Sequence, residues 1–413
     1  MLRNRSLAAI LTAELVSLTG SAMTYVALPW FVLITTGSTA RMGWVLACEL
    51  LPVGLLGIPS GSLIARLGAK RTMNVADAAR VPIMAAIPIL HWTGQLTFGL
   101  LLTCAFLLGS FMAPYYSSSR LILPEVLGDD EQLVAQGSAL VQAANQLTQL
   151  GGPILAGLLI AWLSAPAVLL VDAATYAFSF VVILVFVRAG KRFPADESSR
   201  GVFAGLRYAI HDRLLGPLMG AAAFINFAAQ GLIAMLPVLV VRRFDADSTI
   251  VGFFFAAFGA GALGGSILAS QLVRKVPLLR LAAVGILGMA VPLWLLALDL
   301  PWSVAVVVLA AFGFFAPLVN APVLGIVTVR PPEALRPKVI TAVMTVSVLV
   351  GPLGFLAVGQ ALQYVGLPVV FLGVAVGFSL GALAFVAALR RGEEDGEAIP
   401  ALSSAAQEGQ QAA

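Results

Sequence analysis

Five ionisable side chains lie within stretches of sequence that are otherwise apolar, and their chemistry needs an explanation. They are Glu14, Glu49, Asp77, Arg80 and Asp172. An ionised group in the middle of a membrane helix costs about 2.5–3.5 kcal/mol, so a chain keeps one there for a reason. A carboxyl group in a low-dielectric environment can bind and release a proton, because desolvation disfavours its charged form. Glu14, Glu49 and Asp172 are therefore candidate proton-coupling groups.

The sequence around Glu14 is the most polar of these contexts. Ser17, Ser21 and Thr24 follow it at helical spacing and predict one polar stripe along a helix. Glu14 is thus either a coupling or substrate-binding carboxylate, or a packing residue held neutral by a hydroxyl partner. Ser17 and Ser21 are candidates for lining a substrate cavity.

The remaining ionisable residues have contexts that favour structural roles. Asp77 and Arg80 are three residues apart, which favours an ion pair, with a gating contact to the neighbouring basic loop as the alternative. Glu49 lies beside a face of small residues, so helix packing is favoured for it. Asp172 lies about six residues into its apolar run and could reach the membrane interface. The second half of the chain has no ionisable residue deep in an apolar run, so ion-coupling residues are expected in the first half.

Four amide side chains share one face of a predicted helix. They are Gln142, Asn145, Gln146 and Gln149, at the spacing i, i+3, i+4, i+7. Amides facing lipid would lack hydrogen-bond partners, so we expect this face to line a central cavity, with hydrogen bonds between helices as the alternative. The second half offers thinner counterparts, namely Asn226, Gln230 and Asn320. Aromatic residues could add surface for a ligand or serve only in packing: Tyr115, Tyr116, Phe224 and Phe227.

The elements that position these residues follow from composition. The chain has 413 residues, of which 60% are hydrophobic and 11% charged, whereas soluble domains are about half apolar and a quarter charged. The apolar runs are continuous and about 20 residues long, which predicts membrane-spanning helices rather than a β-barrel. The two cysteines, Cys48 and Cys104, lie inside such runs, so no disulfide framework is expected.

Twelve spans are predicted. Their approximate ranges are 7–34, 42–64, 73–91, 95–118, 138–163, 166–188, 214–241, 250–272, 277–298, 302–326, 338–362 and 367–389. The first is too long for a signal peptide and lacks a small-x-small cleavage site. We predict an N-terminal six-helix bundle (1–188), a cytoplasmic linker (189–213), a C-terminal six-helix bundle (214–391) and a disordered cytoplasmic tail (392–413).

Basic residues predict the orientation of the spans. One set of loops and ends carries twenty Lys and Arg residues, and the other carries only Arg41, Arg242 and Arg243. By the positive-inside rule, both termini are cytoplasmic. The net charge of +4 reflects this asymmetry and gives no indication of nucleic-acid binding.

The two halves of the sequence carry matching landmarks. Gly61 and Gly265 are 204 residues apart, and each ends a GxxxG stretch, "GIPSG" and "GALGG". "FMAP" and "FFAP" lie 203 apart, "GGP" and "VGP" 199, and "ALP" and "MLP" 208. Six spans is an even number, so the copies are parallel repeats, as in transporters that work by alternating access.

The chain resembles the major facilitator superfamily over nearly its whole length. "GSLIARLGAKR" is similar to the signature of its loop between helices 2 and 3, with matches at Gly61, Arg66, Gly68, Lys70 and Arg71 and departures at Ala65 and Ala69. "GGPILAG" is similar to the helix 5 antiporter signature through Gly152, Pro153 and Gly157, with Thr148 and Ala156 departing. The resemblance implies that the first stretch helps to latch a cytoplasmic gate, and that Gly152 and Pro153 shape helix 5.

Three longer stretches are similar to the branch of this superfamily that contains enterobactin and macrolide exporters. They are "RNRSLAAILTAELVSLTGSAMTYVALPWFVLITTGS", "RLILPEVL" and "GSALVQAANQLTQLGGP". The resemblance implies a monomeric drug:proton antiporter of a bacterial inner or plasma membrane, with a role in multidrug efflux and antibiotic resistance.

Three functions remain open at this point. The first is a proton-driven exporter of amphipathic small molecules, the second a dedicated exporter of one metabolite such as a siderophore or antibiotic, and the third a membrane receptor or assembly factor on a transporter fold. His91 and His211 are isolated, and neither metal-ligand spacing nor a phosphate-binding loop occurs in the sequence. We therefore expect no enzyme activity and no cofactor besides the proton gradient.

Overall fold

A computed structural model describes residues 5–127, 131–188, 202–273, 275–332 and 335–394, which form thirteen helices and no strand. Helices suit a bilayer because they satisfy their backbone hydrogen bonds internally. Twelve of these helices are long and apolar enough to cross a membrane, which confirms the number of predicted spans. The helices are α1 (Arg5–Thr36), α2 (Thr39–Leu67), α3 (Ala69–Trp92), α4 (Phe98–Leu127), α5 (Glu131–Leu163), α6 (Ala165–Phe186), α7 (Val202–His211), α8 (Leu215–Arg243), α9 (Ser248–Leu272), α10 (Leu278–Leu296), α11 (Trp302–Val329), α12 (Arg336–Tyr364) and α13 (Leu367–Glu394).

The largest differences from the predicted spans are in α4 and α5. The fourth span was predicted to end at 118, but α4 continues to Leu127, and α5 begins at Glu131 rather than at 138. Both extensions mix polar with apolar residues, for example Ser119 and Arg120 in α4 and Gln132 and Gln136 in α5. The apolar criterion failed here because a helix that lines a cavity stays helical where its side chains become polar.

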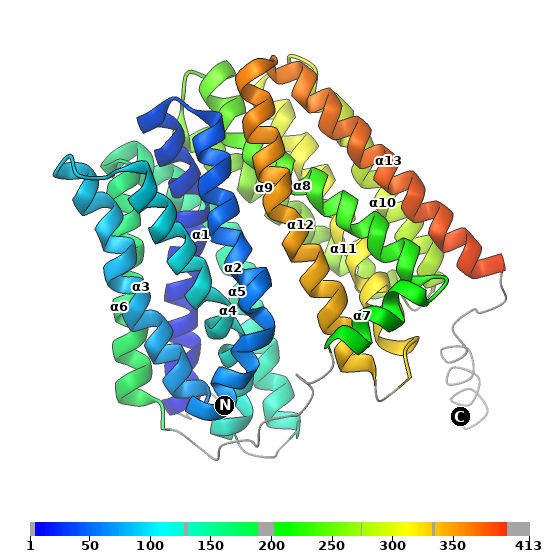
Figure 1. The fold of residues 1–413 in the computed structure, drawn as a ribbon, viewed down its shortest axis with the longest axis horizontal. Helices are drawn as coiled ribbons and strands as arrows, with labels where there is room; N and C mark the ends of the chain where they lie inside the picture. The colour runs from blue at the N-terminus through cyan, green and yellow to red at the C-terminus, as the bar shows by residue number, and fades with distance from the viewer. Residues whose placement is uncertain (1–4, 128–130, 189–201, 274, 333–334, 395–413) are drawn as a thin grey trace.

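The helices form two groups. Helices α1–α6 pack on one another and make up the first half, and α8–α13 make up the second half. In Figure 1 the two halves approach each other at the top of the view and diverge toward the bottom, where α1 begins. Between the halves, α2 packs along α12 and α5 packs along α9. We call the face of the bundle where α1 begins the terminal face, and the face where α1 ends and α2 begins the opposite face.

Two hydrogen bonds between the halves lie near the opposite face and form a matched pair. In one, Thr39 on α2 donates a hydrogen bond to the carbonyl of Gly359 on α12, at 2.9 Å. In the other, Ser248 on α9 donates to the carbonyl of Gly157 on α5, at 3.2 Å. A methyl group on Gly157 would lie 2.9 Å from the Ser248 carbonyl oxygen, and one on Gly359 would lie 2.8 Å from that of Thr39. Glycine therefore permits both contacts, and the pair relates the halves by the internal repeat.

The segment predicted as a linker contains a helix that the sequence analysis did not anticipate. Helix α7 packs against α12 and α8. A methyl group on Gly205 would collide with the backbone of Lys338, so glycine lets α7 approach the start of α12 closely. Residues 189–201 and 395–413, the rest of the predicted linker and most of the predicted tail, lie outside the described residues.

Candidate functional site

A cavity of about 520 Å³ runs along α4 and α5. All four amides of the predicted polar face line it, and α4 supplies the facing wall. Its volume falls in the range of about 300–1,000 Å³ that is typical of drug-sized ligands. The lining residues are Tyr116, Ser119, Arg120, Leu123, Ser138, Val141, Gln142, Asn145, Gln146 and Gln149.

Of the α4 wall only Tyr116 was predicted as possible ligand surface, although the sequence contains a signal for the whole wall. Tyr116, Ser119, Arg120 and Leu123 follow the spacing i, i+3, i+4, i+7, the same spacing that marks the amides on α5. The predicted span ends at residue 118, so Ser119, Arg120 and Leu123 fall outside it. Extending the helix through its polar end would have placed both walls together.

The other cavity candidates do not line this cavity. Ser17 and Ser21 lie inside the first half, where Ser17 is buried and the Ser21 hydroxyl is 3.1 Å from that of Tyr176. Asn226 donates to the Ala222 carbonyl one turn earlier on α8, at 3.1 Å. On the same helix, Gln230 lies against Gly351 of α12, and Asn320 is exposed on α11. A part for these residues in binding stays a prediction.

Glu14 lies next to the cavity but not in it. Its side chain is 1% exposed, and neither carboxyl oxygen has a hydrogen-bond partner. Ser119, which lines the cavity, lies beside Glu14, but its hydroxyl donates to the carbonyl of Tyr116 at 3.2 Å. A carboxyl group that is buried without a partner favours the neutral, protonated form. The nearby Ser17 hydroxyl on α1 is also buried and unpaired.

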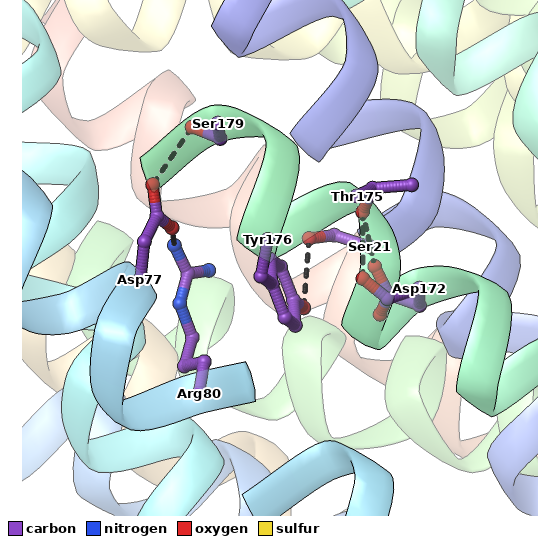
Figure 2. A network of polar contacts seen from close by, with 7 residues as sticks. All are labelled: Ser21, Asp77, Arg80, Asp172, Thr175, Tyr176 and Ser179. Carbon is purple, nitrogen blue, oxygen red and sulfur yellow. Dashed lines mark hydrogen bonds and ion pairs between the residues drawn. The ribbon is translucent and has the colours of Figure 1, made fainter. Parts of the chain in front are cut away.

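Asp77 and Arg80 form the predicted ion pair, and it is fully inside the first half (Figure 2). Asp77 also accepts a hydrogen bond from Ser179 on α6, at 2.7 Å. The Arg80 guanidinium lies 4.2 Å from the ring centre of Tyr115 and 4.3 Å from that of Tyr176. These contacts join α3, α4 and α6. The alternative contact, from Asp77 to the basic loop, is not present in the described residues.

Asp172 lies inside the first half and not at its surface. It is fully buried, and it accepts hydrogen bonds from Thr24 on α1 at 2.5 Å and from Thr175 at 2.9 Å. A methyl group on Gly20 would collide with the carboxyl of Asp172, so glycine allows α6 to approach α1 here. The polar stripe on α1 therefore divides, with Ser21 and Thr24 directed to α6. Figure 2 shows Asp172 and Ser21 at one end of the network and the ion pair at the other.

Glu49 lies in a helix contact, as its sequence context favoured. Its side chain is half-buried, and a methyl group on Gly109 would collide with its backbone carbonyl, so α4 packs directly on α2 at this point. Asp172 and Tyr25 are near enough to interact with it electrostatically.

The predicted gating loop makes a tight turn on the terminal face. Gly68 joins α2 to α3 with a positive φ of 84°, a conformation that glycine adopts without strain. The Lys70 ammonium donates to the carbonyl of Leu184 on α6 at 3.1 Å, and Arg66 and Arg71 are exposed. The Glu125 carboxyl accepts from the backbone N–H of Ala69 at 3.2 Å, a contact that was not predicted.

Gly61 belongs to α2, and its surroundings lie outside the described contacts. On α5, a methyl group on Gly152 would collide with Ala22 of α1, so glycine lets α5 pack closely on α1 here. The carbonyl of Pro153 faces Gly252 of α9, so this proline lies where the two halves meet. Roles in gating for these residues stay predictions.

Comparison with known proteins now decides the family. A family model described as "Major Facilitator Superfamily" matches residues 10–355. The chain belongs to the major facilitator superfamily. It is therefore a multi-pass membrane protein of a transporter family, as the twelve apolar helices indicate.

Curated members of the superfamily are similar over much of their length. "Multidrug efflux pump Tap" of Mycolicibacterium fortuitum is 25% identical over 386 residues, 89% of this chain and 91% of that protein. "Staphyloferrin A transporter" of Staphylococcus aureus is 25% identical over 265 residues, 62% of this chain and 64% of that protein. The crystal structure of the nucleoside transporter NupG has a TM-score of 0.76 at 12% identity, covers 92% of this chain and 99% of that chain, and agrees in fold.

Proposed function

We propose that this chain is a proton-coupled exporter of amphipathic small molecules that works by alternating access. The observation that carries the proposal is the cavity along α4 and α5, with Glu14 buried and unpaired behind Ser119. The cavity offers amide, hydroxyl and apolar surface to a ligand, and the carboxyl offers a proton-binding group beside it. The relative named as a multidrug efflux pump supports this substrate class.

In this proposal the structure is in its inward-facing state and the terminal face is cytoplasmic. The distribution of Lys and Arg supports the orientation. The contacts of Thr39 with Gly359 and of Ser248 with Gly157 support closure of the opposite face. A bacterial inner membrane, a monomer and the proton gradient as the energy source complete the proposal.

Coupling then follows from the position of Glu14. In the outward-facing state Glu14 takes up a proton, and in the inward-facing state it releases the proton as substrate occupies the cavity. A substrate and a proton that favour different states of one protein exchange through their differential affinities. The cavity reaches Glu14 through Ser119, so ligand occupancy and proton release act within one turn of α4.

The test uses purified protein in liposomes with an acidic interior and the dye pyranine trapped inside. Addition of fluorescein or rhodamine 123 should produce accumulation of dye together with proton efflux, and a protonophore should abolish both. Glu14→Gln, which mimics the protonated group, should abolish gradient-driven accumulation and leave dye binding intact. Glu49→Gln and Asp172→Asn are the matched controls, with milder effects expected. Transport by Glu14→Gln at the wild-type rate would refute this role for Glu14.

Export of one dedicated metabolite is the second candidate. It is supported by similarity to the protein named as a transporter of staphyloferrin A. A polyspecific exporter should bind several unrelated dyes with comparable affinity, whereas a dedicated one should bind none of them tightly. A ligand-stabilisation screen that compares cations, neutral macrolides and catecholates separates the two, and ligand-dependent proton flux separates either from a receptor.

A further inference from the structure

The lining of the cavity carries a positive charge that no acidic lining residue balances. Arg120 is the one charged side chain among the described residues that line the cavity, and the other lining side chains are amides, hydroxyls or apolar groups. Arg120 is exposed and lies midway along the α4 wall, one residue from Ser119 and one turn from Tyr116. In the sequence it is one of the twenty Lys and Arg residues on the side predicted to be cytoplasmic.

Nothing in the described residues neutralises this guanidinium. Arg120 makes no ion pair and no hydrogen bond there, in contrast to Arg80 and Arg330, which are paired with Asp77 and Asp212. The nearest described acid along α4, Glu125, turns to α3 and accepts from the Ala69 N–H. Glu14 is buried behind Ser119 and is not among the residues that line the cavity.

The rest of the lining complements an anion. The amide groups of Gln142, Asn145 and Gln146 can donate to acceptor oxygens, and the exposed ring of Tyr116 offers a flat surface. A guanidinium binds carboxylates and related oxyanions through two parallel hydrogen bonds, and low-dielectric walls strengthen the attraction. A cation would meet an uncompensated positive charge in the same space.

We propose that the cavity selects amphipathic molecules with an anionic, oxygen-rich group, and that Arg120 is the residue that selects them. This inference rests on the proposed function, because it takes the cavity as the substrate site. It also leaves Glu14 without direct contact to the substrate, because this carboxyl lies outside the cavity lining.

The test is a binding measurement without any proton gradient. The full chain in nanodiscs of zwitterionic lipid is titrated against fluorescein and rhodamine 123, which share a three-ring frame and carry opposite charge, and fluorescence anisotropy gives both affinities. We expect fluorescein to bind about tenfold more tightly, by the usual strength of a hydrogen bond to a charged group. Arg120→Gln should remove about this tenfold preference and leave rhodamine 123 binding unchanged or stronger. Arg120→Lys should keep part of the preference.

Arg213→Gln is the matched control, because it removes an equal charge from an exposed position between α7 and α8, outside the cavity lining. It should change neither affinity. Tighter binding of rhodamine 123 by the wild type, absence of saturable fluorescein binding, or an equal loss of both dyes in Arg120→Gln would overturn the inference. Failure of proton coupling with the anion preference intact would instead refute the proposed function alone.

Discussion

The two halves of the chain share a helical plan and differ in what they bury. Both pack their helices through glycines that meet a neighbouring backbone, as Gly109 does at Glu49 and Gly313 does at Phe258. Fifteen polar or charged side chains are buried in the described residues, and all except Ser248 belong to the first half. The second half instead buries large apolar side chains, including Phe254, Phe371 and Phe378.

The second half therefore acts as an internal control for the first. It builds the same arrangement of six membrane helices without a buried carboxyl group or arginine among its described residues. Buried polar groups are costly unless they are paired, and unpaired buried side-chain atoms occur only in the first half of the described structure. The arrangement of six helices that both halves share does not by itself require buried charged groups. We therefore infer that the first half uses these groups in transport.

The largest effect that would sharpen this comparison is expected at Arg80. Replacement by leucine leaves the Asp77 carboxylate buried with only the Ser179 hydroxyl as a partner. Removal of one member of a buried ion pair typically lowers the free energy of unfolding by about 3–5 kcal/mol. Arg80→Leu should therefore strongly lower the thermal unfolding midpoint of the purified protein, or prevent its recovery as a monodisperse species.

The matched control comes from the second half. Arg243 pairs with Asp299 at 3.5 Å near the opposite face, where the Asp299 side chain is 91% exposed. A pair with so exposed a carboxylate contributes about 0–1 kcal/mol, so Asp299→Asn, which keeps the Arg243 side chain and its hydrogen bond to the Leu298 carbonyl, should leave the midpoint nearly unchanged. Equal losses at the two sites would show that the buried ion pair carries no special weight in the first half.

The second effect probes what the halves have in common, the matched contacts near the opposite face. Gly157→Ala puts a methyl group 2.9 Å from the Ser248 carbonyl oxygen, whereas a methyl group on Gly151 of the same helix meets nothing within 4 Å. Overpacking costs about 1–3 kcal/mol, and here it applies only to the state in which the halves touch. Gly157→Ala should thus raise the population of the separated state about tenfold, and Gly151→Ala should not.

Distances between spin labels measure this shift. Gln95 and Asp299 are exposed in connections of the opposite face, one in each half, and accept cysteine labels once Cys48 and Cys104 are replaced by serine. Gly359→Ala at the second contact should lengthen the same distance. If only one of the two contacts responds, the halves do not close symmetrically.

Much of the fold was predictable from sequence, because membrane helices are selected by apolar length. The twelve spans and the family follow from that signal and from the loop and helix 5 signatures. The predictions were wrong where a helix is stabilised by its packing and not by a long apolar run. Helix α7 is short and is held by its contact with α12 through Gly205, and the α4 wall is polar because it faces a cavity.

The candidate site was predictable only in part, for a related reason. The α5 amides were found because four of them repeat at helical spacing. Helical spacing shows which residues share a face of a helix, but not which neighbouring helix that face contacts. The sequence therefore could not show that Ser21 and Thr24 contact α6 while Glu14 has no hydrogen-bond partner. The pairing of Glu125 with Ala69 depends on two helices 56 residues apart, and no local pattern signals it.

A smaller effect is expected where a single hydrogen bond is removed. Thr24 donates to the buried Asp172 carboxyl at 2.5 Å, and hydrogen bonds to charged or strongly polar groups contribute about 1.5–3 kcal/mol. Because Thr175 still bonds Asp172, Thr24→Val should lower the free energy of unfolding by about 1–2 kcal/mol. Ser266 on α9 donates only to the Ala262 carbonyl of its own helix, so Ser266→Ala should change it by less than about 0.5 kcal/mol.

The smallest effect compares the two equivalent loops on the terminal face. In the first half, Glu125 places a carboxylate at the N-terminus of α3 through the Ala69 N–H. In the second half, α10 begins after Pro277 with no side-chain cap. A negative charge at a helix N-terminus contributes about 0.3–1 kcal/mol and is screened by salt. Glu125→Gln should therefore lower the unfolding midpoint slightly in low salt and hardly at all at about 1 M salt, where the Debye length falls to about 3 Å. Lys275→Gln in the second loop should have no effect in either condition. A loss for Glu125→Gln that persists in high salt would mean that Glu125 acts through packing, and the loops would then differ in shape rather than in charge.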